Sequence, residues 1–453
     1  MLTKAGECII IINTVCACGA IILGRSFPVE TLKLINFIIA VVFTVCYSYQ
    51  FAYVPLQWIL GAVEKRRRAR SEEAAPKLSG SYAVLICARN EEAVIGDLLR
   101  CVKEQTYKDL TAFVLADNCT DGTAELAGSL GAVVYERNDP EKVGKGYAMD
   151  ALLKSIRRDF PSGFDGYFVF DADNYLPSDY VEKMLAKKEE GFDILTSYRN
   201  SKNYGDNWIS SGYALWFLRE SRYLNHARSL ISSSCAVSGT GFFFSRKVEE
   251  ETGGWPYFTL TEDIEFSIER ITKGYKIGVC VDAEVYDEQP VKFGQSWRQR
   301  MRWTKGYLQV LHRYGGKLLR GMFRGKWSCF DMTMNIMPAF FLSAASFISN
   351  LVFGVIGLLR GGSVLEGLLS ITEFFFDMYL ILFAIGAITV ITEWKHIKAG
   401  TFRKILSVFT FPLFMFTYIP IALSSVFAKP EWKPIEHSVS AEDIEKRIDA
   451  EKH

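Results

Sequence analysis

The sequence predicts an α/β domain inserted between transmembrane α-helices. From Ser81 onwards, short apolar runs alternate with amphipathic segments, which is the pattern of strands joined by crossover helices. On both sides of this region the chain contains apolar runs of membrane-spanning length. The totals agree, because 453 residues exceed one ordinary domain and 49% hydrophobic with 14% aromatic residues is richer than most soluble proteins.

Residues 1–63 are expected to form two transmembrane helices. Apolar runs cover residues 8–24 and 34–63, and the second ends at the basic run EKRRRAR, residues 64–70. Basic residues favour the cytoplasmic side of a membrane, so this run predicts that the following domain is cytosolic. The first run has no small-residue cleavage site, so a cleaved signal peptide is not expected. Residues 64–80 are predicted to be a basic and polar linker.

Residues 81–290 are expected to form the α/β domain. Strands of a parallel sheet are predicted at residues 82–87, 110–115, 132–135, 167–170, 193–197 and 275–281. Polar motifs follow several of these strands: ARNE after the first, ADNCTDGT after the second and DADN after the fourth. In open α/β sheets, ligands bind beyond the carboxyl ends of the strands. This edge of the sheet is therefore the expected binding site.

The C-terminal third is predicted to return to the membrane. Residues 291–330 are expected to form interfacial helices that carry QRMRW, the helix beginning at Gln299, and residues 331–427 about three transmembrane or re-entrant segments. Residues 428–453 form a polar tail that contains WKPIEH. Three crossings would place this tail outside the cell, whereas a bend at Pro412 and Pro420 would return it to the cytosol, and the sequence leaves both topologies open.

Charge and cysteine content exclude some classes of protein. A net charge of +1 gives no reason to expect a nucleic-acid partner, because proteins that bind nucleic acid usually have a basic excess. The ten cysteines are scattered, with no CxxC motif and no zinc-site spacing. They are expected to be reduced packing residues.

Several carboxylates are candidates for chemistry. Asp171 and Asp173 alternate at the end of a predicted buried strand, where they suit a Mg or Mn ion that also holds the phosphates of a nucleotide. A polar strand-end turn is the alternative. Asp263, in TED, precedes a predicted helix and is either its N-cap or a general base that removes a proton from a sugar hydroxyl. Asp117 follows the second strand, where it suits either a turn or the acceptor that a base or ribose needs.

Three basic or aromatic positions have two interpretations each. Lys145 lies between two glycines and either reaches a phosphate or is an ordinary solvated lysine. Arg302, with Gln299 nearby, can hold a diphosphate, and an exposed Trp303 can support a sugar ring. Gln299, Arg302 and Trp303 also suit an amphipathic interfacial helix, with a snorkelling arginine and a tryptophan at the membrane surface.

The order of these motifs is more specific than any one of them. ARNE, ADNCTDGT, GKG, DAD, SGTG, TED and QRMRW follow one another between residues 88 and 303, with apolar helices on both sides. This arrangement closely resembles the processive family-2 glycosyltransferases, which are the cellulose, chitin, hyaluronan and poly-N-acetylglucosamine synthases. The resemblance covers about residues 81–308 and the membrane layout. It implies a GT-A nucleotide-diphospho-sugar transferase fold that polymerises sugars at the cytosolic face of the plasma membrane and extrudes the polymer across it.

The resemblance also implies roles for the matched residues. The nucleotide and its diphosphate are expected to contact Glu91, Asp117, Lys145, Asp171, Gln299 and Arg302. Asp173, with Asp171, is expected to hold Mg or Mn, and Asp263 is expected to be the base, beside Glu262. The acceptor is expected to meet Trp303, Gly239, Thr240 and Gly241, and Trp432 and His437 are expected in a loop that closes over the nucleotide.

The implied reaction is an inverting single displacement. Its expected partners are a UDP-sugar donor, a growing glycan acceptor and membrane lipid, and its product is a β-linked polymer of a hexose or N-acetylhexosamine. A non-processive transferase that places one sugar on a lipid is the alternative enzyme, although such relatives generally lack the full Gln, Arg and Trp arrangement. A membrane transporter or scaffold with an inactive nucleotide-binding domain is the alternative from another class.

Overall fold

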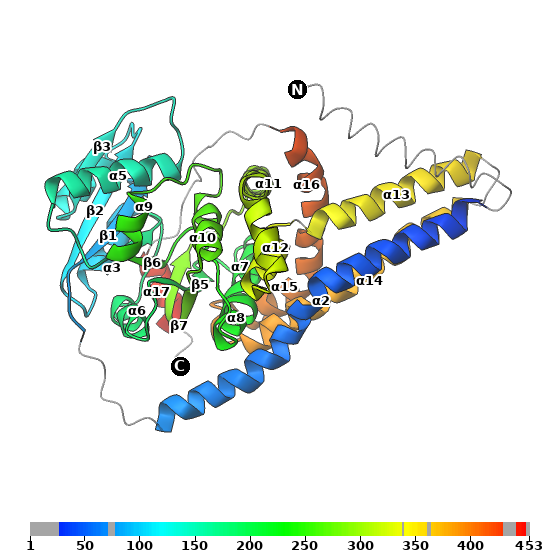
Figure 1. Ribbon diagram of the computed structural model, residues 1–453, viewed down its shortest axis with the longest axis horizontal. Helices are drawn as coiled ribbons and strands as arrows, with labels where there is room; N and C mark the ends of the chain where they lie inside the picture. The colour runs from blue at the N-terminus through cyan, green and yellow to red at the C-terminus, as the bar shows by residue number, and fades with distance from the viewer. Residues whose placement is uncertain (1–26, 71–77, 338, 360–363, 429–440, 450–453) are drawn as a thin grey trace.

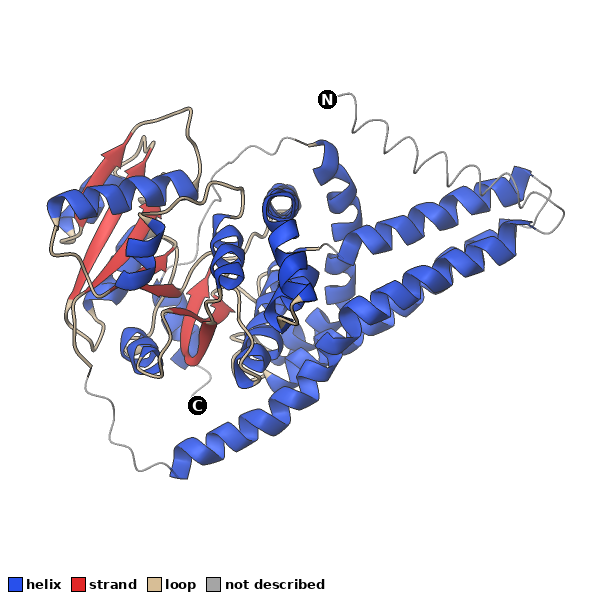
Figure 2. Cartoon of the chain, viewed as in Figure 1, coloured by secondary structure: helices blue, strands red, loops and turns tan. Residues whose placement is uncertain are grey.

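The computed structural model describes residues 27–70, 78–337, 339–359, 364–428 and 441–449. Figure 1 shows an α/β part built on one sheet, from which long helices extend. All strands lie in the α/β part, and the extension is helical (Figure 2). The first predicted membrane run, residues 8–24, lies outside the described residues.

The sheet has seven strands in the order β3-β2-β1-β4-β6-β5-β7. The strands are β1 (Tyr82–Ala88), β2 (Leu110–Asp117), β3 (Val133–Arg137), β4 (Gly166–Phe170), β5 (Ile194–Ser201), β6 (Phe242–Ser245) and β7 (Ile277–Asp287). Strand β6 runs antiparallel to β4 and β5, and all other neighbours are parallel. The expected parallel sheet is therefore a mixed one. The reversed strand follows a tight glycine turn after a long helical excursion, so its direction is set by that turn and not by a crossover helix.

Two helical layers cover the sheet. One face packs against α5 (Lys145–Asp159), α9 (Arg246–Thr252), α10 (Glu262–Lys273) and parts of α11 (Phe293–Phe323) and α12 (Trp327–Ile336). The other face packs against α3 (Ile95–Lys103), α4 (Thr123–Ser129) and α6 (Tyr180–Lys188). Because both faces are covered, the five residues of β4, GYFVF, are all buried.

The second predicted transmembrane helix is longer than expected. Helix α2 runs over Phe27–Arg70, 44 residues, and includes both the apolar run and the basic run that was expected to begin a linker. Glutamate, lysine, arginine and alanine are strong helix formers, and no glycine or proline interrupts residues 64–70. The basic residues therefore continue the helix to Arg70.

The QRMRW segment lies inside a long helix. Helix α11 begins at Phe293, six residues before Gln299, where the sequence predicted a start. The apolar run 332–359 is divided between α12 and α13 (Ala339–Leu359), which meet at 49°. The sequence places a proline at 338, and the preceding Met337 is extended with ψ of 111°, because proline disfavours the helical conformation of the residue before it.

The remaining helices are α14 (Val364–Thr392), α15 (Thr401–Phe416), α16 (Tyr418–Phe427) and α17 (Ala441–Asp449). Among the described helix pairs that could span a membrane together, the pair bent by more than 40° is α12 and α13, and the topology of the tail after Pro412 and Pro420 stays a prediction. Residues Thr401–Phe427 form one candidate span despite the interruption at Thr417, as do Leu34–Arg67 and Phe375–Thr392. Within the described ranges, three helices are thus long and apolar enough to cross a membrane, or four if the bent pair counts as one span.

A buried ion pair joins the helical extension to the α/β part. Arg228, in the short helix α8 (Ala227–Leu230), donates from Nε and Nη2 to the two carboxylate oxygens of Asp331 at 2.8 Å each, and neither side chain is exposed. The hydroxyls of Tyr49 and Tyr53 on α2 donate to the same carboxylate at 2.8 and 2.9 Å. Three distant segments therefore meet at one carboxylate.

Candidate active site

The ends of β1 and β2 carry two of the residues expected at the nucleotide. Asp117 is the last residue of β2 and is 5% exposed, and its Oδ1 accepts a hydrogen bond of 2.6 Å from Nη1 of Arg137, its register partner on β3. Burial raises the pKa of Asp117, and the hydrogen bond from Arg137 opposes that rise. Glu91 follows β1, and its backbone N–H donates to Oγ1 of Thr123 at 2.9 Å. Because β1 and β2 are parallel neighbours, Glu91 and Asp117 share one edge of the sheet.

Asp171 and Asp173 follow β4 at the same edge. Lys145, the first residue of α5, forms an ion pair with Asp171, and its Nζ also donates to the carbonyl oxygen of Gly239 at 2.8 Å. The Asp171 side chain is 39% exposed. Asp173 is buried, and its Oδ2 accepts a hydrogen bond of 3.0 Å from the backbone N–H of Glu288. Lys145 is therefore a partner of the carboxylate edge and not an ordinary solvated lysine.

The chemistry of this carboxylate pair fits a divalent cation. Mg²⁺ and Mn²⁺ prefer carboxylate oxygens, and a cation held by two carboxylates keeps positions for phosphate oxygens and water. Within the part of the chain that the structure describes, no group of three or more His, Cys, Asp or Glu side chains is arranged to hold a metal. Asp171 and Asp173 therefore suit a cation that completes its coordination with a diphosphate.

The glycine-rich turn at residues 238–241 lies directly beside Asp171. Oγ1 of Thr240 accepts a hydrogen bond of 2.9 Å from the backbone N–H of Asp171, and Thr240 is 2% exposed. Gly241 is buried too. Its neighbours pack closely, because an added Cβ there would lie 2.6 Å from a neighbouring side chain. Gly239, with φ of +77°, keeps some exposed surface. The buried Thr240 and Gly241 support the turn from within, and the expected place of all three residues at the acceptor end stays a prediction.

The acidic pair of TED lies at the N-terminus of α10. Thr261 is the N-cap, so the interpretation of Asp263 as an N-cap is wrong, and Glu262 and Asp263 are the first two helical residues. Carboxylates in a first turn are stabilised by the helix dipole. A Cβ on Gly239 would lie 3.7 Å from Oδ2 of Asp263, so this carboxylate lies beside the glycine turn.

Burial raises the pKa of both carboxyl groups. The pKa of Glu262 rises to about 7, and the negative charge of Asp263 adds to the rise while the charges of Lys145 and Arg302 oppose it. The pKa of Asp263 is also raised chiefly by burial, and the same two cations oppose that rise. The acidic pair therefore lies within electrostatic reach of both Lys145 and Arg302. A carboxyl group with a raised pKa is suited to accept a proton during a reaction.

Helix α11 brings Arg302 to the TED turn. Nη1 of Arg302 donates to the carbonyl oxygen of Leu260 at 3.4 Å. One turn later, a Cβ on Gly306 would lie 2.5 Å from Oγ1 of Thr261, so the close approach of α11 requires glycine there. Gln299 is partly buried, and its Oε1 is enclosed without a hydrogen-bond partner among the described residues.

Trp303 lies on the side of α11 that faces α7 (Trp208–Arg219). Its ring makes edge-to-face contacts with Tyr213 and Phe217, with centroid distances of 5.7 and 6.1 Å. The two partner rings are buried, whereas Trp303 keeps part of its surface exposed. An indole held in place by two aromatic rings and open on one side suits a sugar platform.

Sequence reasoning missed Arg199 at this edge. Strand β5 extends to Ser201, beyond the predicted end at residue 197, and the extension includes Arg199. Nη1 of Arg199 donates to the carbonyl oxygen of Ser238 at 2.7 Å, and its Nε donates to Asp287 at 2.9 Å. A basic residue two positions after a predicted strand was the available signal. Trp432 and His437 lie outside the described residues, so the expected closing loop stays a prediction.

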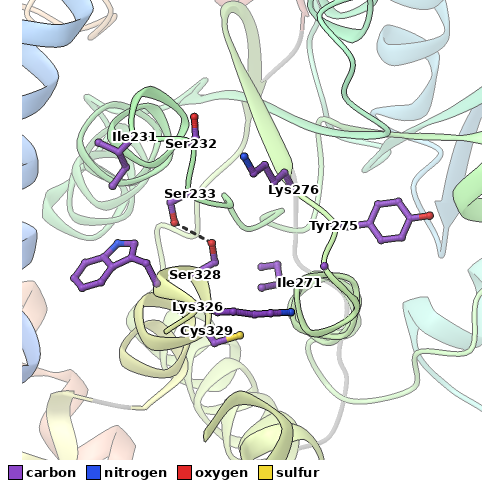
Figure 3. Close-up of a pocket in the computed structure, with 11 residues that line it drawn as sticks. Ile231, Ser232, Ser233, Ile271, Tyr275, Lys276, Lys326, Ser328 and Cys329 are labelled. Carbon is purple, nitrogen blue, oxygen red and sulfur yellow. Dashed lines mark hydrogen bonds between the residues drawn. The ribbon is translucent and has the colours of Figure 1, made fainter. Parts of the chain in front are cut away.

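A separate groove lies away from these residues. It has a volume of about 430 Å³ and is lined by residues from the end of α10, the connection between α10 and β7, the start of α12 and the chain after α8 (Figure 3). In this view Lys276 extends towards Ser232 and Ser233, and Tyr275 points outward. The groove touches the C-terminal end of α10, which is about 18 Å from Glu262 at 1.5 Å per residue. It contains none of the predicted site residues.

Comparison with known proteins shows the family of this chain. The family model described as "Glycosyltransferase like family 2" matches residues 79–306. The chain is 26% identical to beta-monoglucosyldiacylglycerol synthase of Synechocystis sp. over 53% of this chain and 52% of that protein. It is 24% identical to the Probable glycosyltransferase YdaM of Bacillus subtilis over 82% of this chain and 85% of that one.

Two further matches differ in their named activities. The chain is 24% identical to poly-beta-1,6-N-acetyl-D-glucosamine synthase of Staphylococcus aureus over 58% of this chain and 64% of that protein. It thus spans between half and two thirds of the length of the two named synthases that it matches. The mannosyltransferase PcManGT of Pyrobaculum calidifontis, solved with GDP-Man and Mn²⁺, superposes with a TM-score of 0.53 at 14% identity over 87% of this chain and 99% of that one. This likeness shows a shared fold.

Proposed function

Because the chain belongs to glycosyltransferase family 2, we propose that it polymerises a hexose or N-acetylhexosamine from a UDP-sugar into a β-linked polysaccharide at a membrane. The observation that supports this most directly is that α11 places Arg302 at the TED turn, within electrostatic reach of Glu262 and Asp263, and carries Trp303 as the next residue. A cation for a diphosphate, a platform for a sugar ring and a carboxylate base are the three groups that the reaction needs.

In the proposed reaction, Asp263 accepts the proton of the acceptor hydroxyl. The hydroxyl oxygen then forms a bond to the anomeric carbon of the donor, while the bond between that carbon and the UDP oxygen breaks and UDP leaves with the electron pair. The charges of Arg302 and Lys145 stabilise the diphosphate as its negative charge grows. No covalent intermediate is needed, and the configuration at the anomeric carbon is inverted.

Each remaining donor contact has a proposed place. Glu91 and Asp117 contact the uridine, Asp171 contacts the nucleotide, and Gln299 assists at the diphosphate. Asp171 and Asp173 would hold Mg²⁺ or Mn²⁺, which neutralises part of the charge on the diphosphate. The mannosyltransferase of Pyrobaculum calidifontis was solved with a nucleotide sugar and Mn²⁺, which supports the choice of cation.

The proposed location is the plasma membrane, with the catalytic domain in the cytosol. Three candidate spans and the exposed apolar side chains of α2, such as Phe37 at 65% and Val45 at 69%, support insertion. The basic residues that end α2 support a cytosolic position for the domain that follows them.

Transfer of one sugar to a lipid is a second candidate, favoured by the likeness to a beta-monoglucosyldiacylglycerol synthase. Product size separates the two. Purified protein in lipid nanodiscs is incubated with radiolabelled UDP-glucose or UDP-N-acetylglucosamine, and the products are separated by chromatography. A ladder or immobile polymer supports polymerisation, whereas a single organic-soluble spot supports lipid transfer. Absence of UDP release from a full panel of UDP-sugars would contradict both.

A further inference from the structure

A further carboxylate, besides the residues already described, contacts the glycine turn. Oε2 of Glu220 accepts a hydrogen bond of 3.3 Å from Oγ of Ser238. The next residue, Gly239, is the one whose added Cβ would lie 3.7 Å from Oδ2 of Asp263. Two consecutive residues of one turn therefore separate Glu220 from the proposed base. The function assigned above leaves Glu220 without a role.

The position of Glu220 depends on a local change in helix geometry. Helix α7 continues into a π-helical segment, η1 (Glu220–His226), before α8. Such segments occur rarely, mostly within α-helices at functional sites, because the wider turn re-aims side chains. Tyr213, Phe217 and Glu220 follow one another at spacings of four and three residues, so they lie on one face of this helix. Two of them contact Trp303 and the third reaches the glycine turn.

Helix α11 presents a matching face. Tyr307 follows Trp303 by four residues, so both side chains point in the same direction. Burial raises the pKa of the Tyr307 phenol, and the negative charges of Glu220 and Asp263 raise it further. Glu220, Trp303 and Tyr307 are each partly exposed.

Arg199 fixes this arrangement from the sheet. Its Nη1 donates to the carbonyl oxygen of Ser238 at 2.7 Å, and its guanidinium carbon lies 3.7 Å from the ring centroid of Phe217. The glycine turn and the aromatic face of α7 are thus held by one side chain. Asp287 balances the charge of Arg199 with two hydrogen bonds, so Glu220 is not needed for that purpose.

We propose that Glu220 and Tyr307 bind the hydroxyl groups of the terminal acceptor sugar and hold it between Trp303 and Asp263. A carboxylate accepts hydrogen bonds from two neighbouring hydroxyls, and a phenol both donates and accepts one. The aromatic ring of Trp303 covers the apolar face of the same sugar. This inference rests on the proposed transferase function and names two acceptor-binding residues that the motifs of the sequence do not include.

The test compares transfer with donor hydrolysis. Full-length protein in nanodiscs receives UDP-glucose or UDP-N-acetylglucosamine, whichever gives the faster UDP release in the wild type. UDP release and radiolabelled sugar in product are measured together for Glu220→Gln, Glu220→Asp and Tyr307→Phe. Glu250→Gln is the matched control, because Glu250 is exposed on α9 and pairs only at the surface with Arg246. Thermal unfolding shows that each variant is folded.

The expected result is a change in the ratio of sugar incorporated to UDP released. Loss of a hydrogen bond to a charged group weakens binding about tenfold or more, so Glu220→Gln lowers this ratio about tenfold with UDP release within about twofold of wild type. Glu220→Asp recovers part of the ratio, Tyr307→Phe lowers it, and Glu250→Gln does not change it. An unchanged ratio in Glu220→Gln and Tyr307→Phe, or an equal loss of both activities, overturns the inference. Failure of the wild type to release UDP refutes instead the transferase function beneath it.

Discussion

Gly306 on α11 offers a sharp test of how closely that helix must approach the TED turn. A Cβ at this position would lie 2.5 Å from Oγ1 and 2.9 Å from the backbone nitrogen of Thr261. Rotation of the threonine side chain relieves only the first contact. The second contact falls about 0.5 Å short of ordinary van der Waals distance, so Gly306→Ala must move α11 or the turn by about that amount.

The displacement predicts a loss of activity and not of folding. A misplacement of about 1 Å at a reacting centre costs about 100-fold in rate, so a shift of half that size predicts a loss of about tenfold in UDP release. Alanine also raises helix propensity by about 1 kcal/mol, which offsets part of the strain in unfolding experiments. Gly316→Ala on the same helix is the matched control, because a Cβ there would meet nothing within 4 Å.

The assay is UDP release from both variants under saturating donor, with thermal unfolding of each in parallel. We expect Gly316→Ala to keep wild-type turnover and equal or greater thermal stability. Turnover of Gly306→Ala equal to that of Gly316→Ala would refute the view that contact between α11 and Thr261 positions Arg302.

Four further outcomes are expected. Asp263→Asn should lower transfer about 1,000-fold while UDP binding by calorimetry changes little, and turnover within tenfold of wild type would exclude Asp263 as the base. Trp303→Ala should reduce sugar incorporation more than UDP release, and equal losses would contradict a platform. The pKa of Glu262 is about 7 in the fold against an ordinary value of 4.5, so the folded state holds a proton that the unfolded chain releases. Stability should therefore fall as pH rises from 4.5 to 7, and Glu262→Gln should flatten that part of the thermal profile; an unchanged slope would contradict the shift. Treatment with EDTA should stop UDP release and added Mg²⁺ or Mn²⁺ should restore it, whereas full activity in EDTA would exclude a metal at Asp171 and Asp173.

The sequence was informative where a polar motif directly follows a strand. Asp117 and Asp171 belong to such motifs, and parallel neighbours necessarily bring their carboxyl ends to one edge. The predicted strands agree with β1, β2 and β4 to within one or two residues at each end, because a polar motif marks where each strand ends. The proximity of Lys145 to Asp171 could be anticipated only from the resemblance, because nothing local to GKG specifies its partner.

Other features depend on contacts that are distant in sequence. The direction of β6 follows from the glycine turn. The four residues of β6 alone do not indicate which strands it pairs with or in which direction. Arg199 and Glu220 lie 39 and 18 residues from Ser238, and their meeting depends on the length of β5 and on the π-helical turn. The break before α13 was readable from the proline at 338, because the residue before a proline avoids the helical conformation.

The carboxylate of Asp331 limits how far the chain can be truncated for expression. The family match ends at residue 306, so a fragment designed on it would omit Asp331, and one that starts near residue 79 would omit Tyr49 and Tyr53. Such a fragment would leave Arg228 without the carboxylate that it pairs with, and it would expose the surfaces of η1 and α8 that α2 packs against. A soluble catalytic fragment is therefore expected to misfold or aggregate on expression, and production of active protein requires α2 and α12 together with the domain between them.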